Sequence, residues 1–224
     1  MRLYHMTSLD VAMKHILPER RMRLGQFDRL NDPFELLCAS VGDKRARHVF
    51  KFLREYWTEK LGVLCMGRHW KSPLMWAHYA GNHTGVCLGF DVPEELAKPI
   101  RYEGERLQNL INASAPLNGV SIELLEKVLT TKYAQWSYEE EWRLFSKLEE
   151  KDPIDGFYYL PFSDKLVLRE IIVGSRCTKP VGTFRKLVEP VQHTVKVIKA
   201  RPSFETFTMV RQMRVVPIVV KSKN

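Results

Sequence analysis

The sequence contains no long hydrophobic run, and this absence argues against a membrane-spanning helix. No segment approaches the roughly 18 consecutive apolar residues that a span requires. The opening residues, Met1–His5, lack the apolar stretch of a secretory signal peptide. Cysteine is sparse and widely spaced, without a Cys-x-x-Cys pair, which predicts reduced thiols in a cytoplasmic protein. The four cysteines are Cys38, Cys65, Cys87 and Cys177.

Several common nucleotide-binding and metal-binding motifs are also missing. The chain has no Gly-x-Gly-x-x-Gly, no Walker A motif and no His-Glu-x-x-His. These absences argue against a Rossmann fold, a P-loop fold and a zincin. Because no internal repeat, low-complexity tract or Gly/Ser-rich linker divides the chain, we expect a single domain over residues 1–224.

The composition allows a substantial core and carries an excess of positive charge. Hydrophobic residues make up 45% of the chain, and the formal net charge is +9. One concentration of charge lies in a predicted helix and comprises Lys44, Arg45, Arg47, Lys51 and Arg54. The other is the final 32 residues, with seven Lys or Arg against one acid, Glu205. Such patches favour a polyanionic partner such as nucleic acid, although many basic proteins bind none.

The hydrophobic periodicity predicts an α+β fold rather than a regular βαβ alternation. Predicted helices cover residues 7–17, 43–60, 73–80, 105–111, 121–129 and 180–188, with Thr7 as the first cap and Pro18 as the first stop. Predicted strands cover residues 2–6, 21–24, 63–66, 85–90, 100–102, 141–147, 156–161, 167–174, 194–199, 206–210 and 215–220.

The most informative segment is Trp-Ser-Tyr-Glu-Glu-Glu-Trp-Arg at residues 136–143. In an extended strand, Glu139 and Glu141 would point to the same face, roughly 6.5 Å apart along the backbone, with Glu140 on the other face. Two close carboxylates can stabilise a developing cation or divide acid and base roles. The alternative is a solvated acidic turn whose glutamates pair with Arg143 or with nearby lysines.

Three other segments concentrate polar and aromatic side chains. His5 lies at the exit of the opening strand, beside Thr7, for which a capping role is sufficient. The segment from residue 74 to residue 90 carries Trp76, His78, Tyr79 and His83, which can stack on a flat heterocycle or pack in a core. Asn-Asp-Pro-Phe-Glu at residues 31–35 reads as a polar turn, in which Asn31 and Asp32 can cap the chain or bind a ligand. We expect no metal site, because the spacings of Cys65, His69, His78, His83 and Cys87 match no usual zinc pattern.

The sequence blocks just described resemble those of known protein families. Asn-Asp-Pro-Phe-Glu, the segment at 74–90 and the segment at 136–143 together resemble a widespread bacterial family of unknown function, from Leu3 to about Gly174. More distantly, the chain resembles the ADP-ribosyltransferase superfamily of the His-Tyr-Glu type. His5 matches its first-strand histidine, Tyr79 its tyrosine and Glu139-x-Glu141 its Glu-x-Glu turn.

The second resemblance implies a split β-sandwich with helices packed on it, an inserted helical segment at about residues 43–60, and NAD as substrate. It implies that His5 binds the adenine-side ribose and that Tyr79 stacks on nicotinamide. It implies that Glu141 holds the nicotinamide ribose and stabilises an oxocarbenium-like transition state, while Glu139 orients or deprotonates the acceptor. His78 is as well placed as Tyr79 to point inward.

Three functional hypotheses follow. The first is an NAD-dependent ADP-ribosyltransferase that modifies nucleic acid or protein; bacterial enzymes of this class are often toxins, some with antitoxins, or anti-phage effectors. The second is a non-catalytic module that binds nucleotide or nucleic acid through the basic helix at residues 44–54. The third is a nuclease-like hydrolase that uses His78, His83 and the glutamate pair.

Overall fold

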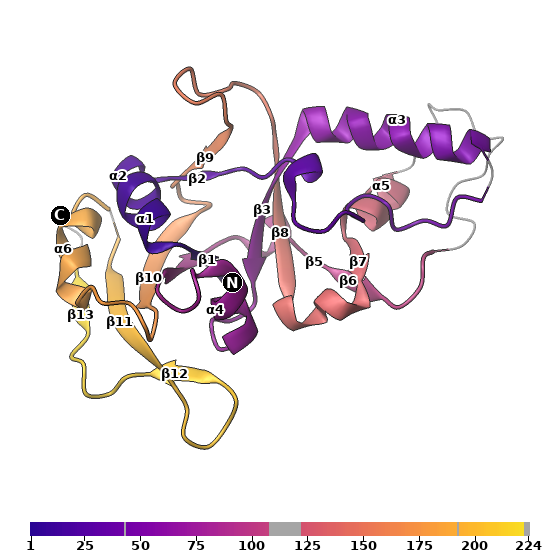
Figure 1. The fold of residues 1–224 in the computed structure, drawn as a ribbon. Coiled ribbons are helices and arrows are strands. Elements are labelled where there is room, and N and C mark those ends of the chain that lie inside the picture. The colour runs from indigo at the N-terminus through magenta and orange to yellow at the C-terminus, as the bar shows by residue number, and fades with distance from the viewer. Residues whose placement is uncertain (43, 108–121, 192, 222–224) are drawn as a thin grey trace.

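A nine-stranded mixed sheet forms the centre of the computed structural model, which describes residues 1–42, 44–107, 122–191 and 193–221 (Figure 1). The strand order is β12-β11-β10-β4-β1-β3-β8-β5, and β13 also pairs with β11. The strands are β1 (Arg2–Thr7), β3 (Leu61–Gly67), β4 (Val86–Asp91), β5 (Ala97–Pro99), β8 (Glu141–Lys147), β10 (Val167–Val173), β11 (Val195–Pro202), β12 (Met209–Arg211) and β13 (Ile218–Val220). The pairs are antiparallel except for β10 with β11, so the sheet agrees with the expected α+β class.

Two short ladders lie beside this sheet. Strand β2 (Arg21–Arg23) pairs antiparallel with β9 (Tyr159–Pro161). Strand β6 (Arg101–Glu103) pairs parallel with β7 (Thr131–Tyr133). The sequence did not predict β5 or β7, because strands of three residues are too short to show an alternating pattern.

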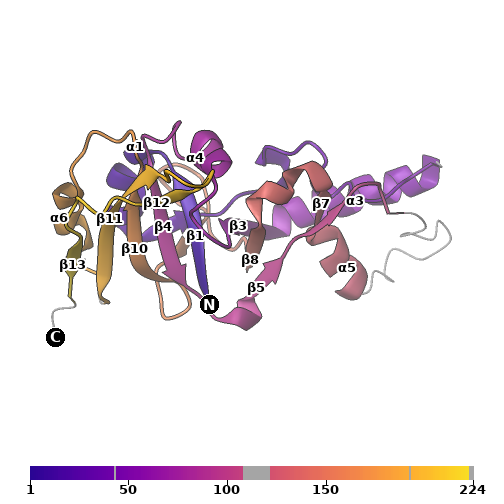
Figure 2. The same cartoon turned by 90° about the horizontal axis from the view of Figure 1, so that it is seen from below.

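The helices are α1 (Leu9–Val11), a π-helical turn (Ala12–Ile16), α2 (Leu17–Glu19), α3 (Lys44–Lys60), α4 (Pro73–Tyr79), α5 (Ile122–Leu129) and α6 (Arg185–Val188). Helix α3 projects beyond the β5 end of the sheet (Figure 2). Two predictions about the first helix were wrong. Its cap is Ser8, whose hydroxyl accepts from Val11 N, and Thr7 is the buried last residue of β1. The helical segment also continues past Pro18 to Glu19, because the π turn has already shifted the backbone hydrogen bonds before the proline.

The expected helix at residues 105–111 is not formed where the structure describes it. Leu107 makes an isolated bridge to Ala39, and Leu107 N donates to Cys38 O at 2.8 Å. Residues 108–111 lie outside the described part of the chain. The remaining helices and long strands agree with the prediction to within a few residues at each end.

Apolar side chains cover both faces of the strands around β4, which is buried along its length except at Asp91. The larger cluster includes Leu3, Leu88 and Phe184 and packs under α1, α2 and α6. A smaller cluster on the α4 side surrounds Trp76. Its other buried members are Met6, Ala80, Cys87, Ile172, Ile198, Ala200 and Met209. Helix α4 is therefore anchored to the sheet through Trp76.

The sheet opens between β1 and β3. Strand β1 pairs with β4 along its whole length, from Arg2 to Thr7, whereas its register with β3 is the single pair Tyr4 with Gly67. Beyond this pair the two strands diverge, and the side chain of His5 reaches across to the carbonyl of Cys65. The opening creates space inside the sheet at the level of α4.

A close backbone approach fixes the end of α4 against β1. After the turn that follows α4, Gly85 N donates to Ala80 O at 2.7 Å. A Cβ atom on Gly85 would lie 2.2 Å from Thr7 O and 2.9 Å from Ala80 O. Only a residue without a side chain fits between these two carbonyls.

We therefore expect Gly85→Ala to lower the free energy of unfolding by about 1–3 kcal/mol, because the added methyl must displace backbone. Urea unfolding followed by circular dichroism measures the change. Gly104→Ala is the matched control, because a Cβ there meets no atom within 4 Å. Equal midpoints for the two variants would contradict the close approach.

Candidate functional site

A cavity of about 160 Å³ lies where β1 and β3 diverge. It is lined by Tyr4, His5, Met6, Leu30, Asn31, Glu35, Cys65, Met66, Gly67, Met75, Tyr79, Lys132, Glu139 and Glu141. Five side chains singled out from the sequence, from four separate segments of the chain, thus line one cavity: His5, Asn31, Tyr79, Glu139 and Glu141.

The two glutamates reach this cavity through a turn and not through a continuous strand. Glu139 ends a 3-10 turn over Ala134–Glu139, Glu140 is left-handed with φ 43°, and Glu141 begins β8. The expectation that Glu139 is in an extended strand is therefore wrong. Both carboxylates are nonetheless buried, whereas Glu140 is exposed and pairs with His69. Because Glu140 adopts the left-handed conformation, Glu139 and Glu141 still point to the same side, as strand geometry predicted.

A buried ion network holds the carboxylates in place. Lys132 Nζ, on β7, lies 2.6 Å from Glu139 Oε2 and 3.2 Å from Glu141 Oε2. Arg143 Nε donates to Glu141 Oε1 at 2.7 Å, and Arg143 Nη1 donates to Glu35 Oε2 at 3.0 Å. All five side chains are at most 6% exposed. The alternative interpretation, that the glutamates pair with Arg143 and a lysine, is thus correct about the partners, but the cluster is buried and not solvated.

The network has opposite effects on the pKa values of Glu141 and Glu35. Burial raises the pKa of Glu141, but the charges of Arg143 and Lys132 outweigh this effect and lower the pKa to about 2. Burial dominates at Glu35 and raises its pKa despite the Arg143 guanidinium. Burial lowers the pKa of Lys132, but its two glutamate neighbours more than reverse this and raise the pKa overall. Glu141 is therefore a carboxylate and Lys132 an ammonium at neutral pH.

Tyr79 extends the network to the mouth of the cavity. Its hydroxyl donates to Glu139 Oε1 and accepts from Asn31 Nδ2 at 2.7 Å. Burial and then the hydrogen bond to Glu139 raise the pKa of Tyr79, so the phenol stays protonated and acts as a donor. Tyr79 is the last residue of α4, and α4 is anchored through the buried Trp76, so the ring position follows from the packing of the helix.

His5, on β1, also lines the cavity. Its Nδ1 is 2.9 Å from the carbonyl oxygen of Cys65. Because a carbonyl only accepts, Nδ1 carries the proton and Nε2 is left as an acceptor. Burial lowers the pKa of His5, which keeps the ring neutral. A neutral imidazole acceptor facing a small cavity is suited to a hydroxyl donor.

Three residues expected to bind a ligand lie elsewhere. Thr7 is buried at the end of β1, and Asp32 caps its own turn by accepting from Phe34 N at 2.9 Å. His78 is exposed and contacts the rings of Tyr79 and Tyr138. Of the two residues weighed for the inward position, Tyr79 is the one that lines the cavity, because His78 points away from the helix face that packs on the sheet. His83 stacks against Trp76 in the turn after α4 and does not line the cavity either.

The sequence analysis missed two members of the network. Lys132 occupies a short strand without a recognisable pattern, and Glu35 contacts Arg143 across 108 residues of sequence. Only the presence of Arg143 beside the glutamates hinted at compensating charge. Over the described ranges, no group of three or more His, Cys, Asp or Glu side chains is arranged to hold a metal ion.

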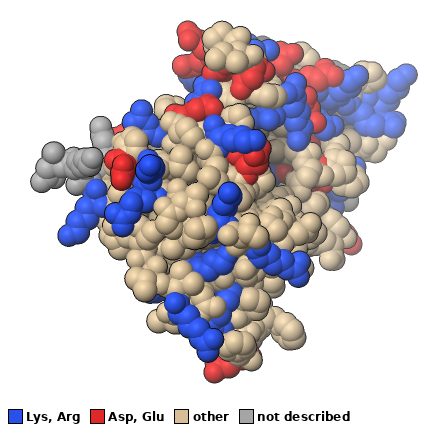
Figure 3. Space-filling view, turned by 60° about the vertical axis from the view of Figure 1, so that its left-hand side comes forward, with Lys and Arg blue, Asp and Glu red and all other residues tan. Residues whose placement is uncertain are grey.

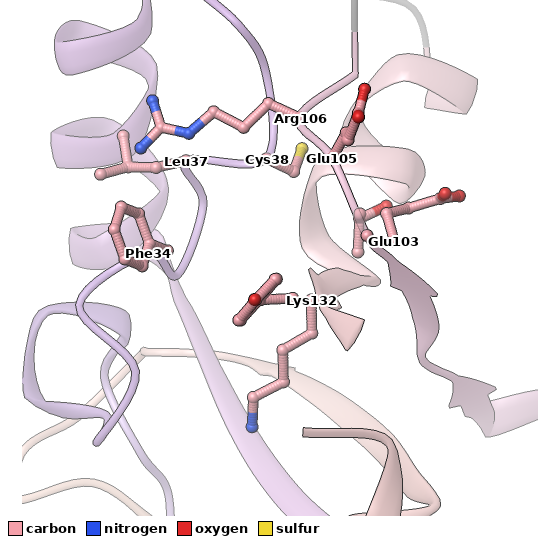
Figure 4. Close-up of a pocket in the computed structure, with 10 residues that line it drawn as sticks. Phe34, Leu37, Cys38, Glu103, Glu105, Arg106 and Lys132 are labelled. Carbon is pink, nitrogen blue, oxygen red and sulfur yellow. The ribbon is translucent and has the colours of Figure 1, made fainter. Parts of the chain in front are cut away.

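A second cavity, of about 260 Å³, lies on the other side of Lys132 (Figure 4). Phe34, Leu37 and Cys38 form one wall, and β6 with β7 forms the other. The guanidinium of Arg106 lies 5.0 Å from the centre of the Phe34 ring. The Lys132 stem borders this space, and its ammonium group points away from it toward the carboxylates. The two cavities therefore lie on either side of Lys132, and the one lined by Glu139 and Glu141 is called the charged cavity.

The predicted nucleic-acid residues occupy α3, away from both glutamates. Lys44, Arg47 and Lys51 are exposed, and Arg54 is half-buried beside Leu53 and Trp57. Lys51 also pairs with Glu55 at 3.8 Å. The side chain of Arg45 lies outside what the structure describes. Within the described residues, no helix is long and apolar enough to cross a membrane.

The ion network predicts a strong coupling between Arg143 and Glu35. Arg143→Met leaves Glu35 buried without its partner, and we expect a loss of about 3–5 kcal/mol in the free energy of unfolding. Adding Glu35→Met to that variant should restore part of the loss, since the uncompensated acid is removed as well. A double-mutant cycle measured by urea unfolding gives the coupling, expected at about 1–3 kcal/mol. A coupling energy of zero would contradict a direct ion pair between Arg143 and Glu35.

Comparison with known proteins gives one match. No curated protein and no solved structure matches this chain. Residues 75–144 match the model of a family described as a protein of unknown function (DUF2971). That range contains the block at residues 136–143 and all but the first residue of the block at 74–90, and so includes Tyr79 and both cavity glutamates. It is shorter than the stretch from Leu3 to Gly174 that the resemblance suggested. Over residues 75–144 the chain is therefore similar to a family of unknown function.

Proposed function

We propose that the charged cavity binds the nicotinamide-ribose part of NAD and catalyses transfer of its ADP-ribose group. The observation that carries the proposal is the meeting of His5, Tyr79, Glu139 and Glu141 around one cavity in the opened sheet. The resemblance to the ADP-ribosyltransferase superfamily assigns this chemistry to the same four residues. Their convergence from three separate segments supports the proposal.

The proposed reaction develops positive charge inside the site. As the bond between nicotinamide and ribose breaks, nicotinamide leaves with the bonding electrons and the ribose carbon becomes cationic. A carboxylate that remains ionised stabilises that cation more than it stabilises the neutral ribose. Glu141 meets this requirement because its pKa is held at about 2. The three acids of the network also outnumber its two cations, Lys132 and Arg143.

The two glutamates differ in how firmly they are held. Glu139 accepts from Tyr79 and, at 2.6 Å, from Lys132. Glu141 Oε2 makes only longer bonds, 3.2 Å to Lys132 and 3.3 Å to Arg143. This oxygen is the one that a ribose 2′-hydroxyl can engage with least loss. In the proposal Glu141 holds the ribose, and Glu139 takes the proton from the acceptor as the new bond to the ribose carbon forms.

The other cavity residues suit the rest of the nucleotide. The ring of Tyr79 offers an aromatic surface for nicotinamide, and its hydroxyl is already fixed between Asn31 and Glu139. The free Nε2 of His5 can accept from a ribose hydroxyl on the adenine side. Each side chain thus has a partner on the proposed substrate.

The central prediction concerns nicotinamide release from NAD. We expect Glu141→Gln to reduce the rate by about 100- to 1000-fold, because the amide cannot neutralise the developing cation. Glu140→Gln is the matched control: it alters the adjacent, exposed carboxylate and should leave the rate unchanged. Circular dichroism of both variants checks the fold, and adenylate-labelled NAD with RNA, single-stranded DNA or protein identifies the acceptor. Absence of nicotinamide release, with no shift in melting temperature on adding NAD, would refute the proposal.

A second candidate is a binding module without catalysis, favoured by the exposed Lys44, Arg47 and Lys51 on the projecting helix α3. These residues are three and four positions apart and so lie on one side of the helix. Such a stripe can follow a phosphate backbone.

On this second reading, Lys44→Glu with Lys51→Glu should weaken duplex binding and flatten its salt dependence by about 0.9 log units in affinity per decade of salt for each lost phosphate contact. Glu141→Gln should leave the affinity unchanged. Fluorescence anisotropy at several salt concentrations measures both quantities. A duplex affinity that is insensitive to the α3 changes would remove this candidate.

A further inference from the structure

The loop that joins β11 and β12 presents two phenylalanine side chains to solvent. Phe204 is 91% exposed and Phe207 is 99% exposed. The surrounding turn is well bonded: Ser203 Oγ accepts from Glu205 N and Thr206 N, and Ser203 N donates to Thr208 O at 2.8 Å. The rings are therefore held outward by an ordered loop.

Three arginines without a carboxylate partner lie on this hairpin or directly after it. The guanidinium of Arg201 lies 4.5 Å from the centre of the Phe204 ring and donates only to Pro202 O. Arg211 Nε is buried without a hydrogen-bond partner, and Arg214 is exposed. Among the residues that the structure describes, none of these three arginines forms an ion pair with a carboxylate. Figure 3 shows Lys and Arg side chains spread over the lower part of this face, with acidic groups sparse there.

The same hairpin is connected to the cavity through the apolar cluster around Trp76. Met209 N, at the start of β12, donates to Lys71 O at 2.8 Å, in the segment that joins β3 to α4. Met209 belongs to the apolar cluster against which the cavity residues Met75 and Tyr79 pack. Arg68 and Lys71, both exposed, lie in the segment between cavity-lining Gly67 and α4. Exposed cations therefore continue from the hairpin toward the cavity.

We propose that the β11–β12 hairpin is a binding platform for single-stranded nucleic acid, with bases stacked on Phe204 and Phe207 and phosphates bound by Arg201 and Arg214. Aromatic rings interleaved with unpaired cations are the two components that such recognition uses. Single strands fit because their bases are free to stack, whereas duplex bases are already stacked on one another.

The observations favour this partner over a lipid surface. Glu205 lies between the two phenylalanines at the tip and is exposed. Inserting both rings into a membrane would carry this carboxylate, and the guanidinium stacked on Phe204, toward the hydrocarbon, where charge is strongly disfavoured. A nucleic acid leaves Glu205 in water and uses the guanidinium directly.

The test measures equilibrium binding without NAD, so its result is independent of any reaction in the cavity. Fluorescence anisotropy compares a short single-stranded RNA, the matching DNA and the duplex. We expect single strands to bind more tightly than the duplex. Phe204→Ala with Phe207→Ala should weaken the affinity for single strands by about 25-fold, or fivefold for each ring. Arg201→Gln with Arg214→Gln should lower the salt dependence by about 0.7 log units per lost phosphate contact.

Phe52→Ala with Tyr56→Ala is the matched control, since these rings are also exposed but lie on α3. It should leave single-strand affinity unchanged. The proposal fails if the hairpin and control variants bind alike, if duplex is preferred, or if the hairpin variant loses only co-sedimentation with anionic phospholipid vesicles. The last result would assign the hairpin to a membrane surface.

Discussion

The candidate site depends on the ion pairs of one fully buried side chain, the guanidinium of Arg143. It lies on β8 between Glu35 and Glu141, and Lys132 continues the network to Glu139. An unpaired charge in such an interior would be strongly destabilising, so each member requires the others. The turn at residues 31–35, strand β7 and strand β8 are thereby fixed relative to one another. This arrangement holds Glu139 and Glu141 against Lys132 at the cavity, and the neighbouring positive charges keep Glu141 ionised.

The divergence of β1 and β3 leaves a cavity beside these carboxylates, in which a ligand can bind. If β1 and β3 remained paired along their length, backbone hydrogen bonds would occupy the space that the cavity now fills. His5 satisfies the carbonyl of Cys65 and so replaces one of the lost bonds between the strands. Helix α4, fixed by Trp76 below and by the close approach of Gly85 at its end, brings Tyr79 to the mouth of the opening.

Sequence reasoning succeeded where the signal was local. The long strands and helices follow from hydrophobic periodicity, and the Glu139-x-Glu141 spacing identified both acids of the cavity. It failed where the cause lies in distant contacts. Nothing near Glu35 or Lys132 in the sequence reveals that they meet Arg143 and Glu141, because these contacts exist only after the chain has folded. The ligand-binding role expected for Thr7 and Asp32 stays a prediction. Neither residue lines the cavity, since Thr7 ends a buried strand and Asp32 caps a turn.

The central claim is that NAD occupies the charged cavity beside β1, β3 and α4, and methionine methyl groups can report on it directly. Met6, Met66 and Met75 line this cavity, whereas Met13 and Met22 pack in or against the larger core cluster. With 13C-methyl methionine, addition of NAD should shift the NMR signals of the three cavity methionines and leave those of Met13 and Met22 unchanged. Unshifted signals at Met6, Met66 and Met75 under saturating NAD would contradict the account.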